Sequence, residues 1–169
     1  MKELFHRISV RKYEAREVED EKLVEILRAG MQAPSAGNQQ PWEFYIIKDA
    51  ERRAALGEVH QWATPAAEAP VSIVSAYREE TRMPEYTPQD MAICMENMWL
   101  MIDALGLGGV WLGIAPVEER MRKVEEIAGI PSGQRAFGIL TVGYPAEERP
   151  QADRFEAERI HGLEVPHGA

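Results

Sequence analysis

Two short segments of the chain carry residues whose types and spacing suit ligand binding. In the first, RISVRKY, the side chains of Arg7, Ser9 and Arg11 alternate along the chain, so an extended conformation projects all three to one side. Two guanidiniums and a hydroxyl on one face suit a phosphate, which accepts charge-assisted and bidentate hydrogen bonds. The alternative is a solvated basic segment that pairs with nearby acidic residues.

The second segment, APSAGNQQPW, reads as a rigid loop between a helix and a strand. Pro34 ends the preceding helix, turn residues follow, and Pro41 favours an extended conformation for Gln40. The loop therefore displays the hydroxyl of Ser35 and the amides of Asn38 and Gln40. Because amides both donate and accept, they fit the mixed polar edge of a heteroaromatic ring. The alternative is a connector with no role in binding.

Familiar catalytic motifs are missing from the sequence. It has no glycine loop followed by a Walker lysine, no nucleophile elbow and no zincin pair, and its four histidines show no metal-ligand spacing. The GLGG stretch that begins at Gly106 follows a helix and precedes a strand, so it reads as a helix end and turn rather than a dinucleotide fingerprint. If the chain is an enzyme, a bound organic cofactor is expected to supply the difficult step.

Length and composition indicate one globular domain, residues 1–169, of 19.1 kDa. The net charge of −9 disfavours binding to nucleic acid or to an anionic membrane surface. The single cysteine, Cys94, allows no internal disulfide, which suits a reducing compartment. The start of the chain does not resemble a signal peptide, and the most apolar stretch, 97–117, contains Asp103 and four glycines. A cytoplasmic protein is expected, with no membrane partner.

Apolar periodicity alternates between helical and strand patterns along the chain, which predicts an α+β, three-layer fold. The predicted helices cover 2–8 (with Leu4, Phe5 and Ile8 inward), 20–33, 50–60 (capped by Asp49), 88–105 and 116–128. The predicted strands cover 43–48, 71–77, 109–112 and 135–144.

The helix predicted over 88–105 is apolar around most of its circumference. Its polar residues form one narrow stripe, and the other faces carry Met, Ile, Leu, Cys and Trp. Such a helix needs cover on several sides, so a second subunit is expected; the alternative is a central helix wrapped by its own chain. The 24 residues after Pro145 are charged and weakly periodic, and they either fray or cross onto a partner.

Taken together and in this order, the segments RISVRKY, APSAGNQQPW, GLGGVWLG, GILTVGYP and ADRF resemble the nitroreductase family of FMN-dependent oxidoreductases. The resemblance implies a three-layer α/β/α fold with a mixed, mainly antiparallel central sheet. It also implies an intertwined homodimer with an extended C-terminal tail, and FMN held at the interface between the subunits.

The resemblance assigns residues to FMN binding position by position. The first segment would hold the FMN phosphate and the polar edge of the flavin, and the loop would reach FMN from the other subunit. The segment around position 113 would lie along the ring near N5, and a basic residue of the tail would contact the phosphate. These residues are Arg7, Ile8, Ser9, Arg11, Pro34, Ser35, Ala36, Asn38, Gln40, Leu112, Gly113, Ile114 and Arg154.

Two positions depart from the family pattern. Ile8 stands where many members carry Arg or His, and Ala152 stands where some carry a lysine. Arg11 is therefore the candidate for stabilising negative charge near N1 of the reduced flavin. The flavin contact expected from residues 50–69 is not assignable from the sequence.

The resemblance implies an enzyme in which NADH or NADPH gives a hydride to flavin N5 and leaves. A nitroaromatic, quinone-like or flavin-like acceptor then takes the electrons at the same site, in a ping-pong sequence. Two alternatives stay open. One is a flavin-dependent relative with another task, such as dehalogenation or flavin cleavage, and the other is a non-catalytic dimeric module that binds FMN. No metal site is expected.

Overall fold

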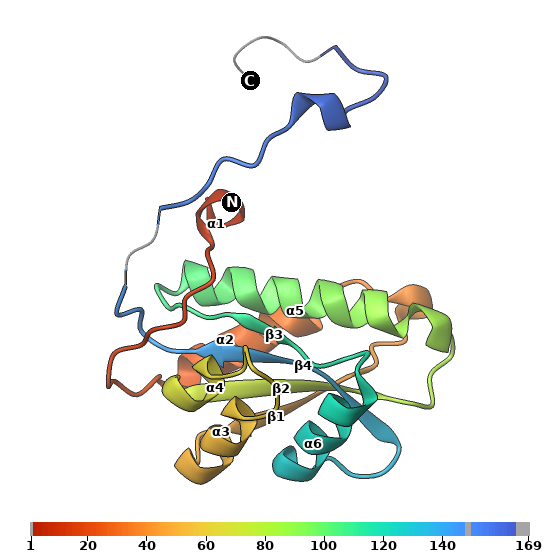
Figure 1. The fold of residues 1–169 in the computed structure, drawn as a ribbon. Helices are drawn as coiled ribbons and strands as arrows, with labels where there is room; N and C mark the ends of the chain where they lie inside the picture. The colour runs from red at the N-terminus through yellow and green to blue at the C-terminus, as the bar shows by residue number, and fades with distance from the viewer. Residues whose placement is uncertain (1, 148–149, 165–169) are drawn as a thin grey trace.

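The computed structural model describes residues 2–147 and 150–164, and its centre is a four-stranded antiparallel sheet (Figure 1). The strand order is β1-β2-β4-β3. The strands are β1 (Trp42–Ile47), β2 (Val71–Arg78), β3 (Trp111–Gly113) and β4 (Gln134–Val142). The sheet therefore matches the mainly antiparallel expectation, and the parallel element among the described residues is an isolated bridge between Ser9 and Gly109.

Helices cover both faces of this sheet, as Figure 1 shows. One face carries α2 (Asp20–Met31) and α5 (Thr87–Ala104), and the other carries α3 (Ala50–Gly57), α4 (Pro65–Glu68) and α6 (Glu118–Ala128). A short helix α1 (Glu3–His6) precedes them, and single 3-10 turns occupy Ala36–Asn38, Pro84–Tyr86 and Ala157–Arg159. None of the helices in the described part of the chain is both long and apolar enough to cross a membrane.

Alternation along β2 and β4 divides the core into two clusters. Ile73 and Leu140 are register partners and belong to the cluster that includes Met95 of α5. Their chain neighbours Val74 and Ile139 are also partners and pack on the opposite face with α3 and α6. Because successive strand residues point to opposite faces, one pair of buried strands supplies both cores. The three-layer prediction is confirmed.

Local signals placed most elements correctly. The Asp49 side chain accepts a 2.9 Å hydrogen bond from the backbone N–H of Arg52, so the predicted cap of α3 is confirmed. Gly106 adopts φ +71° just after α5, as expected for a helix end and turn. The predicted strand over 109–112 is shifted, because Gly109 pairs with the N-terminal segment and the ladder with β4 begins at Trp111.

The prediction for residues 2–8 is wrong in two respects. The helix covers only Glu3–His6, and the side chains of Leu4 and Phe5 are 56% and 78% exposed rather than buried. α1 contacts α5 and Leu4 faces α2 and α5, but the described chain leaves most of these two side chains in solvent. A four-residue helix has too few internal hydrogen bonds to be stable by itself, so this segment needs another surface.

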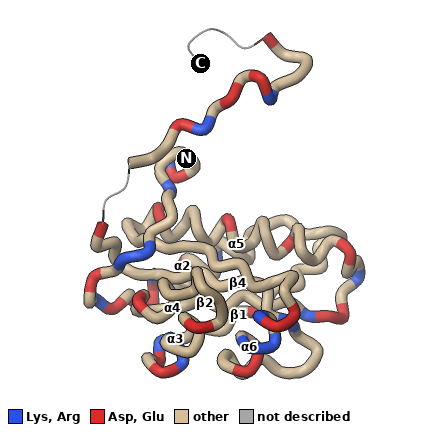
Figure 2. The backbone as a smooth tube through the Cα atoms, viewed as in Figure 1, with Lys and Arg blue, Asp and Glu red and all other residues tan. Residues whose placement is uncertain are grey.

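Apolar side chains are exposed at several places on the described chain, and those on the tail, on α5 and around α1 bear on the assembly. The C-terminal tail runs away from the body in Figure 1, with Phe155 and Leu163 exposed. Ile93 of α5 is also exposed, and Leu4, Leu100 and Met101 line a cavity of about 500 Å³ between α1, α2 and α5. Figure 2 shows that charges concentrate on the outer helices and loops, whereas α5 is mostly uncharged.

Candidate functional site

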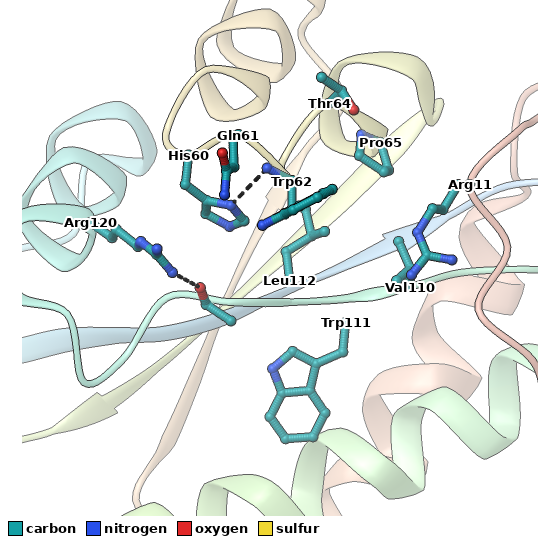
Figure 3. A pocket seen from close by; sticks show the side chains of 11 residues that line it. Arg11, His60, Gln61, Trp62, Thr64, Pro65, Val110, Trp111, Leu112 and Arg120 are labelled. Carbon is teal, nitrogen blue, oxygen red and sulfur yellow. Dashed lines mark hydrogen bonds between the residues drawn. The ribbon is translucent and has the colours of Figure 1, made fainter.

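A cavity of about 340 Å³ lies where the N-terminal segment, β3 and α6 meet the loop that precedes α4 (Figure 3). Arg11 lines it from the N-terminal segment, residues 110–113 from β3 and the residue before it, and Arg120 from α6. The segment 60–65 contributes His60, Gln61, Trp62, Thr64 and Pro65. The volume is within the range of small-molecule sites, about 300–1,000 Å³.

Backbone pairing places Arg11 beside this cavity. The N–H of Val10 donates a 3.0 Å hydrogen bond to the carbonyl of Gly109, and the Tyr13 hydroxyl donates a 2.7 Å bond to the carbonyl of Val10. Gly108 lets Val10 pack closely, because a Cβ at Gly108 would lie 2.8 Å from the Val10 side chain. The segment therefore cannot shift relative to Gly108 and Gly109 without losing the Val10 contacts, and these contacts hold the neighbouring Arg11 in place.

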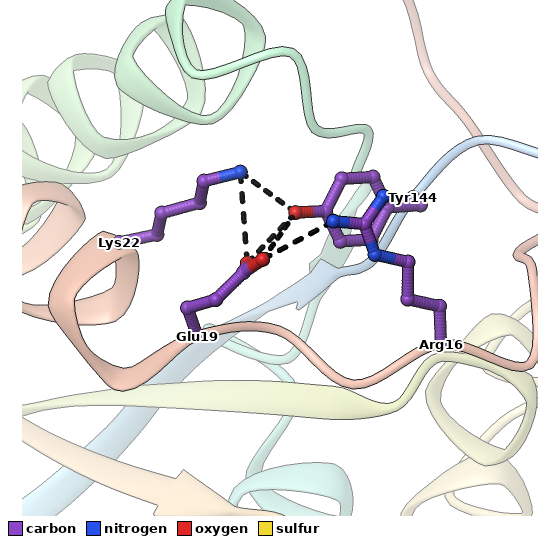
Figure 4. A network of polar contacts seen from close by, with 4 residues as sticks. All are labelled: Arg16, Glu19, Lys22 and Tyr144. Atoms are coloured by element: carbon purple, nitrogen blue, oxygen red, sulfur yellow. Dashed lines mark hydrogen bonds and ion pairs between the residues drawn. The ribbon is translucent and has the colours of Figure 1, made fainter.

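A polar cluster anchors the chain just beyond this segment (Figure 4). The guanidinium of Arg16 lies 3.6 Å from the ring centroid of Tyr144, whose hydroxyl accepts a 2.7 Å bond from the Lys22 ammonium. The same hydroxyl donates a 2.7 Å bond to the Glu19 carboxylate. The backbone N–H of Glu19 and then the Tyr144 hydroxyl stabilise that carboxylate and lower its pKa from 4.5 to about 2. The cluster therefore joins the start of α2 to the residues that follow β4.

Replacing Tyr144 by phenylalanine should reduce the loss of unfolding free energy that occurs when the pH is lowered. A carboxyl whose pKa is lowered by folding stabilises the protein above its unfolded value and loses that contribution as pH falls toward its folded value. For Glu19 this window runs from pH 4.5 to about 2. Urea denaturation at pH 7 and pH 3 should show a smaller loss of free energy of unfolding in Tyr144→Phe than in the wild type. Tyr86→Phe, at an exposed tyrosine, is the control and should match the wild type.

The floor of the cavity is built by β3. Leu112 pairs with Ile139 of β4 and is 4% exposed, so it presents a fixed apolar surface. Gly113 is exposed, and its carbonyl accepts a 3.4 Å hydrogen bond from the Arg120 guanidinium, which ties α6 to the strand. Ile114 is fully buried in the core and does not line the cavity. A flat ligand could lie against this floor, within reach of the backbone groups of β3.

The wall opposite β3 contains an imidazole with a fixed hydrogen bond. The backbone N–H of Trp62 donates to Nδ1 of His60 over 3.1 Å, and the Trp62 side chain is 71% exposed. Burial and then the charge of Arg120 lower the pKa of His60, which keeps it neutral at pH 7. Among the described residues that line the cavity, two are arginines and none is acidic. The cavity therefore favours an anionic or electron-rich ligand.

Arg7 does not join this cavity, so the expected convergence of Arg7, Ser9 and Arg11 is not observed. Arg7 follows α1 and turns toward α5, where its guanidinium lies 3.9 Å from the Trp99 ring centroid. Its Nε lies 3.3 Å from the Glu96 carboxylate, close enough for an ion pair but not aligned as a hydrogen bond. The carbonyl of Ser9 accepts a 3.4 Å bond from the Arg11 guanidinium, so only these two residues stay together.

The loop after α2 lies outside the cavity of its own chain, and one expectation about its shape is wrong. Gln40 has φ +47° rather than an extended conformation, and Asn38 has φ +55°. The backbone N–H of Gln40 donates a 3.0 Å bond to the Ser35 hydroxyl, and its carbonyl accepts from the Arg78 guanidinium. These two bonds hold Gln40 at a positive φ, although the following proline favours an extended conformation.

The remaining predicted residues lie elsewhere in the single chain. Pro34 and Ala36 belong to the same loop, away from Arg11. Ile8 lines a different cavity, beside Asp103 and Leu107. Arg154 is exposed on the tail, which leaves the body in Figure 1. One chain therefore brings together Arg11, Leu112 and Gly113, and holds the loop, Arg7 and the tail apart from them.

Sequence reasoning missed the residues that complete the cavity. His60 and Trp62 follow a helix with no recognisable motif, and Arg120 lies in α6 among other charged residues. The available signal is weak: an exposed tryptophan between polar residues. Thiol-based catalysis by Cys94 is not supported, because burial raises the pKa of its thiol to about 12. No group of three potential metal-ligating side chains is arranged for a metal within residues 2–147 and 150–164.

Comparison with known proteins identifies the family. The sequence model of the Nitroreductase family matches residues 4–79 and 62–144. An Archaeoglobus fulgidus protein, provisionally named NADH dehydrogenase/NAD(P)H nitroreductase, is 38% identical over 167 residues that cover 95% of each chain. The crystal structure of a provisionally named NADH oxidase from Clostridium acetobutylicum superposes with a TM-score of 0.91 at 42% identity, covering 96% of this chain and 99% of that one.

A third relative was solved with a cofactor. A provisionally named nitroreductase from Desulfovibrio desulfuricans, in complex with FMN, has a TM-score of 0.83 at 27% identity and covers 98% of this chain and 96% of that one. The chain described here is a member of the nitroreductase family.

Proposed function

We propose that the chain is an FMN-dependent oxidoreductase that uses NADH or NADPH to reduce small electron-poor acceptors. The observation that carries the proposal is the cavity beside β3, in a chain whose relative from Desulfovibrio desulfuricans was solved in complex with FMN. The residues present fit that cofactor. Two guanidiniums and no acid line the cavity among the described residues, Leu112 offers an apolar floor, and Trp62 offers an exposed aromatic face.

Each part of the cavity has a distinct task in this proposal. Arg11 holds an anionic part of FMN, the phosphate or the electron-rich edge of the ring, and Arg120 adds positive charge on the other side. Leu112 and Gly113 lie along the ring and exclude water from one of its faces. FMN bound here would supply the hydride-transfer chemistry. Because one cavity serves both half-reactions, NAD(P)H and a nitroaromatic, quinone-like or flavin-like acceptor use it in turn.

We also propose that two copies of the chain form an intertwined homodimer with FMN between them. Apolar side chains on α1, on the outer side of α5 and on the tail are exposed, and a second copy would bury them. The loop with Ser35 and Asn38 and the tail with Arg154 lie apart from the cavity of their own chain. In a dimer they can reach the cavity of the partner subunit, which explains why family-matched residues are separated within one chain.

Mixing two defective variants tests the shared site. One variant is Arg11→Ala, and the other removes the amides of two predicted site residues by Asn38→Gly and Gln40→Gly, substitutions that tolerate the positive φ at each position. In a mixed dimer, one site holds both defects and the other holds none. Co-refolded mixtures should therefore regain high-affinity FMN binding in about half of the sites of the mixed dimers. If the subunits have exchanged and the mixture still regains no high-affinity FMN binding, the shared site is contradicted.

Arg11→Ala should weaken FMN binding by about 10- to 100-fold. A hydrogen bond to a charged group contributes about 1.5–3 kcal/mol, and 1.4 kcal/mol corresponds to tenfold in affinity. Lys12→Ala removes the same charge one residue away, at an exposed position that does not line the cavity, and should change the affinity less than threefold. Quenching of FMN fluorescence measures both. Equal affinities for the two variants would contradict the role assigned to Arg11.

Anaerobic reduction tests the activity. NADH or NADPH should bleach the flavin absorbance of the loaded protein, and a nitroarene or quinone should restore it over repeated cycles. Bound FMN that neither nucleotide reduces would indicate a non-catalytic binding module. Bleaching followed by reoxidation only with a halogenated aromatic, or loss of the flavin itself, would favour the alternative tasks of dehalogenation or flavin cleavage.

A further inference from the structure

We propose that His60 is a ligand-binding residue of this cavity, a neutral imidazole whose Nε2–H donates a hydrogen bond to the ring of the bound flavin. The inference rests on the proposed FMN site and adds a residue that the sequence motifs leave unassigned. His60 lines the cavity, and its Nε2 is buried with no hydrogen-bond partner in the described part of the chain.

The tautomer of His60 follows from its other nitrogen. The backbone N–H of Trp62 lies 3.1 Å from Nδ1, and a backbone N–H can only donate. Nδ1 must therefore carry a lone pair, which places the proton of the neutral ring on Nε2. Figure 3 shows this bond at the wall of the cavity, with the imidazole between Trp62 and Arg120. The backbone thus fixes Nε2 as a donor.

The surroundings also keep the ring neutral. Protonation would add a hydrogen to Nδ1, directly opposite the N–H of Trp62, and break that bond. The two ionised groups that line the cavity with His60 are Arg11 from the N-terminal segment and Arg120 from α6, both cations that oppose a third positive charge. Burial and then the charge of Arg120 lower the pKa of His60 in agreement with this geometry.

A buried donor without an acceptor costs free energy, and native proteins rarely keep one. A ligand that supplies the acceptor removes this cost, which makes Nε2 a preferred contact. The phosphate of FMN is better matched to the guanidinium of Arg11, because a dianion gains most from a full positive charge. The uncharged carbonyl oxygens and ring nitrogens of the flavin match a neutral donor. His60 therefore orients the ring, whereas Arg11 supplies charge.

A ligand can reach Nε2 only if side chains around it move, and Trp62 is the one we assign to this movement. The imidazole nitrogen is covered in the free chain, and Trp62, which lines the same cavity, is 71% exposed. Turning an exposed indole outward breaks few contacts, since most of its surface is already in water. The ring of the ligand then lies between the indole and the β3 floor formed by Leu112, with Nε2 at its edge.

The test compares two substitutions that differ in one hydrogen-bond donor. His60→Gln places an amide N–H near the position of Nε2, whereas His60→Phe keeps a ring and has no donor. Titration of FMN by fluorescence quenching should give a dissociation constant about tenfold higher for His60→Phe and within about threefold of wild type for His60→Gln. Thermal melts of the unloaded proteins check that both variants fold.

A second readout is independent of the variants and of turnover. Long-range proton–nitrogen NMR of the wild type at pH 7 should show His60 with Nε2 protonated and Nδ1 unprotonated, and the Nε2 signal should shift when FMN is added. A proton on Nδ1, an Nε2 signal unmoved by bound FMN, or an unchanged affinity in a folded His60→Phe would overturn the assignment of His60 alone. Wild-type protein that binds no FMN would overturn the proposed function together with this inference.

Discussion

Replacing Gly109 by alanine should destabilise the protein by about 3 kcal/mol or more, the upper end of the cost of overpacking. A Cβ at this position would lie 2.2 Å from the backbone carbonyl oxygen of Thr141, far inside contact distance. Thr141 cannot give way, because it is fully buried on β4 and its hydroxyl accepts a 2.9 Å bond from the N–H of Val110. Relief therefore requires separating β4 from the segment that pairs with residues 9–10.

Urea denaturation of Gly109→Ala measures this loss, and Gly113→Ala is the matched control. Gly113 lies four residues on, its added Cβ would meet nothing within 4 Å, and its φ is not positive. Its free energy of unfolding should stay within about 0.5 kcal/mol of wild type. Because Gly109 also pairs with Ser9, Gly109→Ala should weaken FMN binding even at temperatures where the fold survives. A wild-type denaturation midpoint for Gly109→Ala would contradict the packing described.

Asp90→Ala should cost about 3 kcal/mol and loosen the loop after α2. The Asp90 carboxylate is 3% exposed and accepts bonds of 2.9 Å from the N–H of Ala36 and 2.6 Å from the Gln39 side-chain amide. Hydrogen bonds to charged groups contribute about 1.5–3 kcal/mol each, and removing the acceptor takes the Asp90 partner away from the Ala36 N–H and from one N–H of the Gln39 amide. The Oε1 of Gln39 accepts from the backbone N–H of Met83, and its Nε2 also donates to the Met83 carbonyl, so these two bonds fix the orientation of the amide and no rotation of it rescues the loop.

Chemical denaturation measures the stability of Asp90→Ala, and amide hydrogen exchange at residues 36–40 measures the loosening. Asp90→Asn should fall between Asp90→Ala and the wild type, since its Oδ1 still accepts from Ala36 while its amide faces the Gln39 donor. Asp103→Ala, on the same helix, removes a carboxylate paired with the exposed His6 and should cost less than about 1 kcal/mol. Equal losses for Asp90→Ala and Asp103→Ala would contradict the role of Asp90.

The fold was largely predictable because its signals are local. Apolar and β-branched residues in 71–77 and 135–144 fit strands buried on both faces, and the Asp49 cap and Gly106 turn each depend on one residue type. The inward placement of Leu4 and Phe5 failed because a four-residue helix carries no information about which surface covers it. Asp90 is one of the polar residues of the helix predicted over 88–105, and the structure buries it under the loop that contains Ala36 and Gln39.

The site was predictable only where motifs exist. Arg11, Leu112 and Gly113, which the family pattern assigns to FMN binding, line one cavity, and their role there stays a prediction; His60, Trp62 and Arg120 line it without belonging to any motif. Arg7 does not lie with Ser9 and Arg11 as predicted, because it contacts Trp99 and Glu96 of α5 instead. Alternate side chains point to the same side only along an extended strand. Arg7 directly follows the short helix α1, so it is not part of such a strand.

Titration of the purified chain with FMN, read by fluorescence quenching beside light scattering of the same sample, tests the central claim most directly. We expect saturation at one FMN per chain in particles with the mass of two chains. A chain that leaves FMN fluorescence unquenched at any concentration, or that binds FMN fully as a single copy, would contradict a flavin site shared by two subunits.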